Sequence, residues 1–496
     1  MKSVLVRGVL LALIPLIAFT INLYAQGNGP GNVEGNFLYV DNGGSVSGFS
    51  VAANGALSVI PGSPFPTGAE SSGFGNDMEV SPVGNFLYVS LDSNTLSSSI
   101  SVFSINPGTG ALTPVPGSPF TTGTGLRGGL SLAVASDNRF LFAGNTSTGS
   151  VAAFRVAANG VLTHVPGSPF PVSNIGISGM AVSSDGKFLS VTIPTSSNHI
   201  AMLTIGSDGA LTPVPGSPFL VGGDDEITSV EFNCEGSLLF VGDNTSLGSV
   251  YVFNVSANGA LTPVSGSPFT FNGLGSQAIL LNPGTSLLFA VNTHRANVSA
   301  LNVSPTGSLS LAPGSPLFLD DPNNEDRRPI DVAVNKEGTL LYALSADSAI
   351  HVLTIGTNGT LTPVSGSPFF NCCSGYGATI AAYPPKTCPP AKGGPPDPNF
   401  DLCIQDSSTG NTLRINSTTG GYQFFNCSSG LTVGGMGQVQ RIGCFITFNH
   451  FATDRRIIAR VNTCSKQGYA AVRIFSALSV VRIVDRDTSN NTCACN

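Results

Sequence analysis

Two glutamates, Glu79 and Glu231, interrupt an otherwise apolar pattern and are the residues of this chain best suited to acid–base chemistry. Each lies in an alternating stretch that is typical of a short β-strand. The corresponding stretches carry Ala133, Ala181 and Ala333. A buried carboxylate is costly unless it is paired or protonated, so we expect each glutamate to meet an arginine or to face water. Such a group can act as a general base or hold a ligand; the alternative is a structural role.

The other candidate site residues lie in predicted loops or at strand starts, at one rim of the fold. Loops positioned by a rigid scaffold often carry function, and arginine binds anions in a bidentate manner; the alternative is a solvated loop surface. His294 is the histidine that we expect to join Glu79 and Glu231 in any catalysis. The candidate binding residues are Asp77, Arg127, Arg295, Arg327, Arg328 and Asp331.

No pattern in the sequence indicates a metal site or a cofactor. The acidic runs at 224–226 and 320–321 lack the alternating Asp-x-Asp spacing of a calcium loop. The recurring Gly-Ser-Pro triplets are not nucleophile elbows, because no Gly-x-Ser-x-Gly pattern with partner residues accompanies them. We therefore expect neither a metal nor a cofactor, and we interpret the triplets as architecture.

These residues are positioned by a sequence repeat. The segment Gly-Ala-Leu-Thr-Pro-Val-Pro-Gly-Ser-Pro-Phe at 110–120 recurs seven times with small changes, and its Gly-Ser-Pro triplets are spaced 48 to 55 residues apart. A strand-rich repeat of this length is the signature of a β-propeller or a solenoid. The repeat therefore predicts an all-β fold built from seven similar units.

One unit predicts four short strands. The second unit places them at 77–81, 86–90, 100–105 and 111–115, with Gly, Pro, Asn and Asp turns between them. Most units have Asn-Gly or Asp-Gly before the fourth strand, which is the strongest local signal of a two-residue hairpin. Proline in the fourth strand cannot donate to a ladder, so this strand must form an outer edge.

The ends of the repeat region predict a closed ring. Only three strands precede the first triplet, at 37–40, 46–51 and 56–60, and one strand follows the last, at 378–383. Together, the three strands at the start of the repeat region and the one strand at its end make up a four-stranded blade. We therefore predict a seven-bladed β-propeller with four-stranded blades, and an open solenoid is the alternative.

The predicted domains follow from composition. Residues 1–25 have a positive start and an apolar core before Ala25, as in a cleaved secretory signal peptide; the alternative is an uncleaved anchor. The propeller spans 34–384, a proline-rich linker spans 385–399, and a small cysteine-rich β domain spans 400–496. We expect a secreted, periplasmic or extracellular protein.

Nine of the ten cysteines lie after residue 370, and in a secreted chain they predict disulfides. Spacing suggests the pairs Cys403–Cys427 and Cys444–Cys464, although spacing alone leaves other pairings open. Cys234 stands alone in the repeat region, and we interpret it as a small buried apolar residue.

Charge limits the classes of partner. Charged residues make up 10% of the chain and the net charge is −7, while the segment from Lys386 onward carries a net +5 from eleven basic and six acidic residues. No basic run is dense enough to predict nucleic-acid binding. We expect a monomer without a membrane span after signal removal, with a small molecule, an extracellular polymer or a protein bound at the propeller rim.

The repeat region resembles the lactonase-like seven-bladed propellers, which include 6-phosphogluconolactonase-like and YVTN-type proteins. The resemblance is carried by Asp-Gly-Lys-Phe-Leu at 185–189, Phe-Leu-Tyr-Val at 86–89 and Asn-Gly-Ala-Leu-Thr-Pro-Val at 258–264. It implies His, Arg and Glu at the channel, with a Pro-Arg-His element before an inner strand. The matching column here is Asp77, Ser131, Gly179, Ser229, Ala278 and Asp331. No catalytic histidine carries over.

The leading hypothesis is therefore a non-catalytic or weakly catalytic extracellular binding or scaffold protein that uses the loops at the channel mouth. Two alternatives stay open. One is a lactone hydrolase that cleaves a cyclic carboxylic ester with Glu79, Glu231, His294 and the rim arginines. The other is a structural repeat protein of the cell envelope.

Overall fold

The computed structural model describes residues 35–68, 77–92, 98–123, 129–194, 198–222, 227–244, 249–271, 276–293, 295–319, 328–370 and 379–388, and the strands between 402 and 484. Within these residues the chain forms strands and turns, and it contains no helix that could span a membrane. The predicted signal peptide at 1–25 lies outside the described residues.

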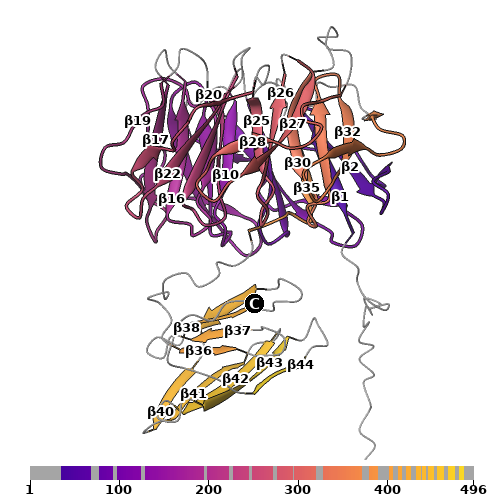
Figure 1. The fold of residues 1–496 in the computed structure, drawn as a ribbon. Helices are drawn as coiled ribbons and strands as arrows, with labels where there is room; N and C mark the ends of the chain where they lie inside the picture. The colour runs from indigo at the N-terminus through magenta and orange to yellow at the C-terminus, as the bar shows by residue number, and fades with distance from the viewer. Residues whose placement is uncertain are drawn as a thin grey trace, which may run out of the picture. The chain divides into compact units, whose positions relative to one another are not determined.

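Seven antiparallel sheets form the blades of a propeller (Figure 1). Blade 1 contains β35 and β1 to β4, blade 2 contains β5 to β9, and the order continues to blade 7, which contains β30 to β34. The inner strand of each blade contacts the inner strands of both neighbouring blades, so the ring is closed. The inner strands are β5 (Met78–Val80), β10 (Leu130–Val134), β15 (Met180–Val182), β20 (Ile227–Phe232), β25 (Ser276–Leu281), β30 (Pro329–Val334) and β35 (Ile380–Tyr383).

The next two strands of every blade are the most buried. The second strands are β1 (Phe37–Asp41), β6 (Phe86–Leu91), β11 (Phe140–Asn145), β16 (Phe188–Ile193), β21 (Leu238–Asp243), β26 (Leu287–Asn292) and β31 (Leu340–Ser345). The third strands are β2 (Ser45–Val51), β7 (Ser99–Ile105), β12 (Ser150–Val156), β17 (His199–Ile205), β22 (Ser249–Val255), β27 (Asn297–Val303) and β32 (Ala349–Ile355). Their side chains pack against the adjacent blade, so the core lies between blades.

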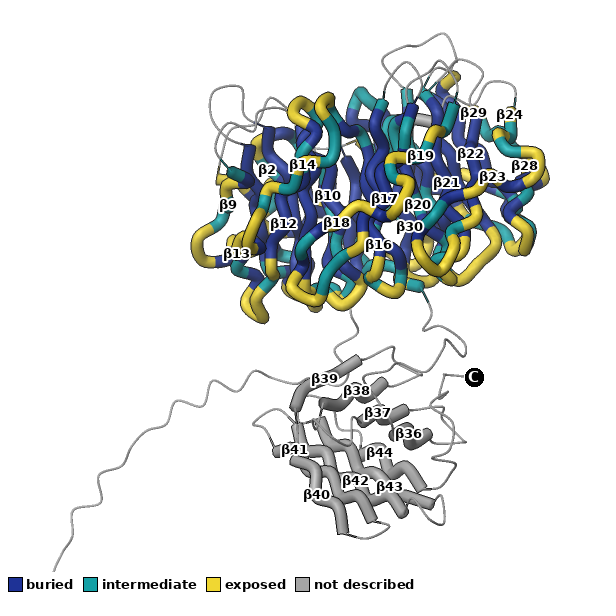
Figure 2. Tube along the Cα trace, turned by 90° about the vertical axis from the view of Figure 1, so that its left-hand side faces the viewer, coloured by how far each residue is buried: buried dark blue, intermediate teal, exposed yellow. Residues whose placement is uncertain are grey.

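The fourth strands form the outer edge, as their prolines predicted, and they are short: β3 (Leu57–Val59), β8 (Leu112–Pro114), β13 (Leu162–His164), β18 (Leu211–Pro213), β23 (Leu261–Pro263), β28 (Leu309–Leu311) and β33 (Leu361–Pro363). Figure 2 shows the exposed residues gathered on these outer strands and on the turns. The edge resumes after each Gly-Ser-Pro as a two-residue strand that the sequence did not predict: β4 (Phe65–Pro66), β9 (Phe120–Thr121), β14 (Phe170–Pro171), β19 (Phe219–Leu220), β24 (Phe269–Thr270), β29 (Leu317–Phe318) and β34 (Phe369–Phe370).

The repeated serine explains why this motif occurs in every blade. Where the edge strand leaves the ladder, the serine hydroxyl accepts a hydrogen bond from a backbone N–H of the third strand, for example Val102 N to Ser118 Oγ at 2.9 Å. The same bond forms in all seven blades at 2.9–3.0 Å. A buried N–H without an acceptor is costly. The triplet is therefore architecture, as predicted.

The first and last strands of the ring share blade 1. In this blade β35 pairs with β1 in antiparallel register, with Leu38 opposite Ala382 and Val40 opposite Ile380. The rings of Phe37 and Tyr383 stack beside this pair with centroids 5.8 Å apart. The predicted closure by a strand from the far end of the repeat region is confirmed.

The strands beyond residue 400 form two further antiparallel sheets. The four-stranded sheet contains β36 (Leu402–Gln405), β37 (Thr412–Ile415), β38 (Gly421–Phe425) and β39 (Thr432–Met436). The five-stranded sheet contains β40 (Gln438–Ile442), β41 (Phe445–Phe451), β42 (Arg455–Asn462), β43 (Gln467–Ile474) and β44 (Val480–Val484). The strands are consistent with the predicted all-β character of this region, and the predicted domain boundaries stay predictions.

Candidate functional site

Glu79 and Glu231 occupy the same position in their blades. Glu79 lies opposite Tyr88 and Glu231 lies opposite Phe240, which are in each case the third residues of the second strand. The other five blades have small or apolar residues at this position: Ala133, Ala181, Leu280, Ala333 and Ala381. The two glutamates are therefore the only acids in this ring of equivalent residues, and they belong to blades 2 and 5.

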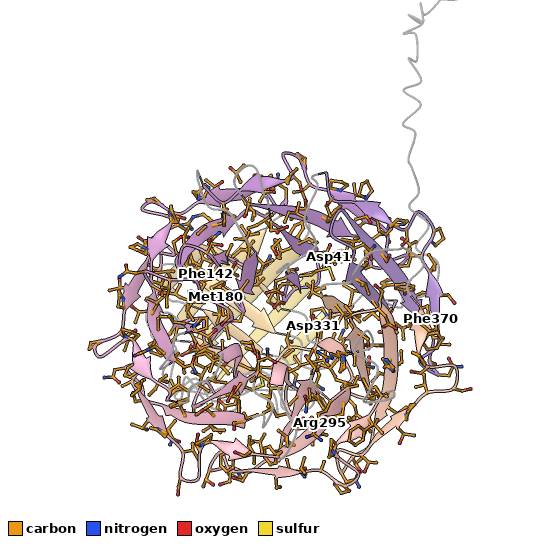
Figure 3. All side chains as sticks on the ribbon, turned by 90° about the horizontal axis from the view of Figure 1, so that it is seen from above. Asp41, Phe142, Met180, Arg295, Asp331 and Phe370 are labelled. Atoms are coloured by element: carbon orange, nitrogen blue, oxygen red, sulfur yellow. A yellow bond between two sulfur atoms is a disulfide. The ribbon has the colours of Figure 1, made fainter. Side chains whose placement is uncertain are left out.

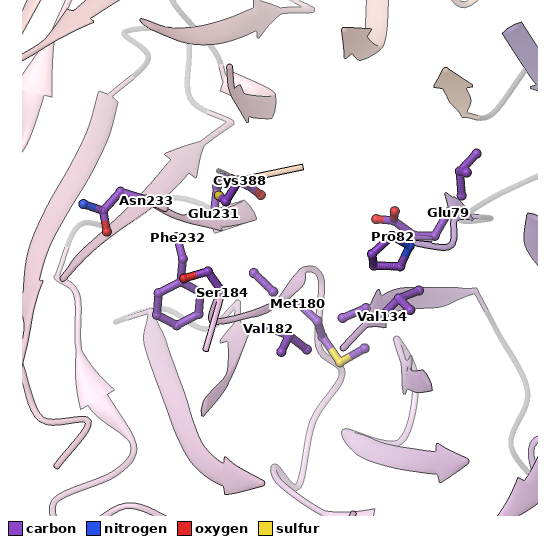
Figure 4. A pocket seen from close by; sticks show the side chains of 13 residues that line it. Glu79, Pro82, Val134, Met180, Val182, Ser184, Glu231, Phe232, Asn233 and Cys388 are labelled. Carbon is purple, nitrogen blue, oxygen red and sulfur yellow. The ribbon is translucent and has the colours of Figure 1, made fainter. Parts of the chain in front are cut away.

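Both carboxyl groups line one cavity of about 190 Å³ (Figure 4). Its walls come from the inner strands of blades 2 to 5 and from three turns between the first and second strands. In Figure 4, Glu79 and Glu231 lie on opposite sides, with Val134, Met180 and Val182 between them. The remaining lining residues are Val80, Pro82, Ala133, Ala181, Ser184, Phe232, Asn233 and Cys388.

Burial governs the protonation of both glutamates. It raises the pKa of Glu231 to about 8. Burial also raises the pKa of Glu79 well above its usual range, and the negative charges of Asp77, Glu231 and Asp331 raise it further. A desolvated carboxylate with other acids nearby favours its protonated form. Both shifts favour protonated carboxyl groups, which can donate as well as accept hydrogen bonds.

The sequence left open whether an arginine would neutralise these acids. Among the described residues, no ion pair involves Glu79 or Glu231. The described residues that line the cavity include no lysine, arginine or histidine. The shifts in pKa follow from this arrangement, because burial acts on both carboxyl groups without a cation to oppose it.

Asp77 and Asp331, predicted as binding residues, connect neighbouring blades. The Asp77 carboxylate accepts hydrogen bonds from Met78 N in its own blade and from Leu132 N in blade 3, both at 2.8 Å. Burial raises the pKa of Asp77, and these backbone N–H groups oppose that rise.

Asp331 has the same role at the ring closure. Its Oδ2 accepts hydrogen bonds from Thr379 Oγ1 at 2.7 Å and from Ile380 N at 2.9 Å, next to the closing strand. Burial raises the pKa of Asp331 to about 6. These hydrogen bonds hold the Asp331 carboxylate against the closing strand.

The candidate arginines are not brought to the cavity. Arg295 is exposed in the connection between β26 and β27, and Arg328 is half-buried just before β30. Both connections are at the opposite end of the blades from the first-to-second-strand turns that line the cavity. Figure 3 shows Asp331 close to the axis and Arg295 farther out. Arg127, Arg327 and His294 lie outside the described residues, so their predicted roles stay predictions.

The interpretation of Cys234 as a small apolar residue was wrong. Cys234 lies in the turn between β20 and β21 and forms a disulfide with Cys388, 154 residues later, with Cα atoms 5.2 Å apart. Ring closure brings the segment after β35 next to blade 5, and no local spacing in the sequence marks this partner. Cys403 lies on β36 without a described side chain, and Cys427, Cys444 and Cys464 lie outside the described residues, so their pairing stays a prediction.

Comparison with known proteins finds a family model and solved structures that the propeller resembles. The family model described as lactonase, 7-bladed beta-propeller, matches residues 31–165 and 94–215. No curated protein matches the chain. The comparison with solved structures, in contrast, found similar folds along the whole propeller.

Three solved structures illustrate this similarity. A proposed 6-phosphogluconolactonase of Bacteroides uniformis is 17% identical, with a TM-score of 0.55, over 70% of this chain and 99% of its own. One of Bacteroides fragilis is 16% identical, with a TM-score of 0.54, over 72% and 99%. A Lactobacillus plantarum protein is 14% identical, with a TM-score of 0.52, over 70% and 99%. At such identities the likeness concerns the fold alone.

Proposed function

Because the repeat region of this chain is a lactonase-like seven-bladed β-propeller, we propose that the protein is an extracellular binding module that holds a small molecule in the cavity between Glu79 and Glu231. The observation that carries this proposal is the composition of the cavity wall. Among the described residues that line it, the two carboxyl groups are the only ionisable side chains apart from the disulfide-bonded Cys388.

This composition favours binding over hydrolysis. Opening a lactone requires a base that activates water and a donor or cation that stabilises the oxyanion of the tetrahedral intermediate. The wall supplies carboxyl groups for the first task, but its described residues include no cationic side chain for the second, which leaves only neutral hydrogen-bond donors to stabilise the oxyanion. Negative charge developing near Glu79 would also meet the field of Asp77, Glu231 and Asp331.

The same field limits the class of ligand. An anion would be repelled by any carboxylate that has lost its proton, whereas a neutral, hydroxyl-rich molecule can exchange hydrogen bonds with a protonated carboxyl group. A volume of about 190 Å³ suits a single small ring. We therefore propose an uncharged, hydroxylated small molecule as the ligand.

Two features support the extracellular part of the proposal. The amino-terminal pattern at 1–25 is typical of a secretory signal peptide. The Cys234–Cys388 disulfide is also typical of an oxidising compartment, since cytosolic thiols are kept reduced.

Calorimetric titration at pH 7 with glucose, δ-gluconolactone and gluconate tests the proposal, because the three probes share a carbon skeleton and differ in charge. We expect the neutral probes to bind and gluconate to bind at least tenfold more weakly. Glu231→Gln should retain most of the neutral binding, and Glu231→Lys should abolish it. Equal binding of gluconate, or no effect of Glu231→Lys, would contradict a ligand in this cavity.

Lactone hydrolysis is the second candidate, and the pKa of Glu231 supports it. A carboxyl group with a pKa of about 8 is close to the value that suits proton transfer near neutral pH. Hydrolysis of γ- and δ-lactones by the purified protein, lost in Glu231→Ala, would replace the binding proposal with an enzymatic function.

A further inference from the structure

The segment that follows the closing strand contacts turns at the end of the propeller where the cavity lies. We call residues 384–388, which follow Tyr383 at the end of β35, the strap. It begins beside the β5–β6 turn of blade 2, where a Cβ on Gly84 would lie 3.4 Å from Tyr383 Cε2 and 3.8 Å from Pro385 Cδ. The strap thus begins against blades 1 and 2.

The middle and the end of the strap reach other blades. Lys386 Nζ donates a hydrogen bond to the backbone oxygen of Glu337 at 3.3 Å, in the β30–β31 turn of blade 7. Cys388 then bonds to Cys234 in the β20–β21 turn of blade 5. Blade 5 is three blades away from blade 1 around a ring of seven. The strap therefore crosses the central channel at the end formed by the turns between first and second strands, and we call this end the cavity mouth.

The end of the strap is part of the cavity wall. Cys388 lines the cavity together with Glu231 and Asn233, and Figure 4 shows Cys388 beside Glu231. The turns that the strap contacts are of the same kind as those that contribute Pro82, Ser184 and Asn233 to the lining. The Cys234–Cys388 disulfide and the two glutamates therefore lie at the same end of the propeller.

We propose that the strap is a lid over the Glu79–Glu231 cavity, held shut by the Cys234–Cys388 disulfide and opened when that bond is cut. Lys386 forms the one strap side-chain hydrogen bond that the structure records at the cavity mouth. Such a single contact contributes about 1 kcal/mol. Without the disulfide, the strap is therefore free to leave the turns while β35 keeps its ladder with β1.

A dithiol reductant can carry out the opening. Its thiolate attacks one sulfur of the Cys234–Cys388 bond, which gives a mixed disulfide and one cysteine thiolate. The second thiol of the reductant then displaces the remaining cysteine. Two electrons and two protons thus pass to Cys234 and Cys388, and the reductant leaves as its own disulfide.

The strap can cover the two glutamates whether or not the protein binds a ligand. That the strap also controls entry of a ligand rests on the proposed function. We therefore test the lid first by the rate at which carboxyl groups react with a water-soluble carbodiimide and an amine, read residue by residue by mass spectrometry. The samples are the full-length protein and its Cys234→Ser/Cys388→Ser variant, without reductant, so that other disulfides stay intact.

In the double variant we expect Glu231 and Glu79 to react at least fivefold faster than in the unchanged protein. Exposed Glu235, in the turn that carries Cys234, should react equally in both. Asp77 and Asp331, held by backbone N–H groups, should also be unchanged. Lys386→Ala keeps the disulfide and should leave the glutamate rates within twofold of the original.

Two results would overturn the lid. One is an unchanged rate at Glu231 in the double variant. The other is an equal rise at Asp331 together with faster hydrogen exchange in β35, which would mean that the disulfide maintains the ring rather than covering the cavity. If the glutamates become reactive but δ-gluconolactone binds neither the double variant nor the unchanged protein, the lid stands and the proposed function fails.

Discussion

At the scale of single residues, the same position does different work in different blades. Seven equivalent inner-strand positions carry Glu79, Glu231 and five small or apolar residues. Only two of the seven blades therefore have an ionisable side chain at this position. Asp77 and Asp331 show the converse. They were candidate binding residues, and their carboxylates accept backbone hydrogen bonds from the next blade. An acid near the axis is therefore not by itself a ligand contact.

The raised pKa of Glu231 predicts how stability depends on pH. Because the folded-state pKa is about 8 and the ordinary value is 4.5, the folded protein favours the protonated form, and stability falls as pH rises from 4.5 to 8. Glu231→Gln removes this loss. We expect equal stability of the two proteins near pH 4 and a variant that is more stable above pH 8 by a few kcal/mol, at about 1.4 kcal/mol per pKa unit.

Denaturant unfolding at pH 4, 6, 7 and 9 measures this effect. Exposed Glu235→Gln serves as the matched control, because Glu235 lies four residues away in the following turn, and it should show no comparable divergence. A Glu231→Gln curve parallel to that of the unchanged protein across this range would show that Glu231 is already ionised at neutral pH.

At the scale of the element, the edge of each blade depends on the motif serine. The fourth strand ends at its proline, and the serine hydroxyl then accepts the third-strand N–H before the two-residue strand resumes the pairing. The sequence pattern indicated a turn at this point. The resumed pairing, as in β9 against β7, was not predicted because two residues give no periodic signal.

Ser118→Ala should destabilise the propeller by about 1–3 kcal/mol, because Val102 N loses its acceptor in a buried position. Ser104→Ala in the same blade is the control, since Ser104 Oγ only donates to Thr113 O at an exposed site, and it should change stability by less than about 0.5 kcal/mol. The free energy of unfolding in urea measures both. Equal effects of the two substitutions would remove the special role of the motif serine.

At the scale of the whole molecule, two connections join parts of the propeller that are distant in sequence. The pairing of β35 with β1 unites strands that are more than 300 residues apart in sequence. The Cys234–Cys388 bond then ties the segment after β35 to blade 5. Of the two, only the disulfide persists in the unfolded chain, where it closes a far longer loop than any hairpin does.

Loss of the disulfide should lower the free energy of unfolding substantially. For a loop of 154 residues the chain-entropy account gives about 5 kcal/mol. Cys234→Ser and the Cys234→Ser/Cys388→Ser variant should lose the same amount, since either change removes the bond. Thermal and denaturant unfolding measure the loss. A change below about 1 kcal/mol would mean that the bond constrains little beyond the strap.

Sequence patterns were sufficient to predict the ring. Seven copies of one motif, Asn-Gly hairpins and proline at the edge are local signals, and local signals fix strands, turns and the number of blades. The unequal ends of the repeat region also predicted closure by residues near 380, which the pairing of Leu38 with Ala382 confirms.

Only the tertiary structure decided which residues meet. It brought Glu79 and Glu231 to one cavity, engaged Asp77 and Asp331 in blade junctions, placed Arg295 and Arg328 elsewhere and joined Cys234 to Cys388. The physical reason is that burial, the field of neighbouring charges and a bond across 154 residues arise from residues far apart in the chain. No window of sequence contains them together.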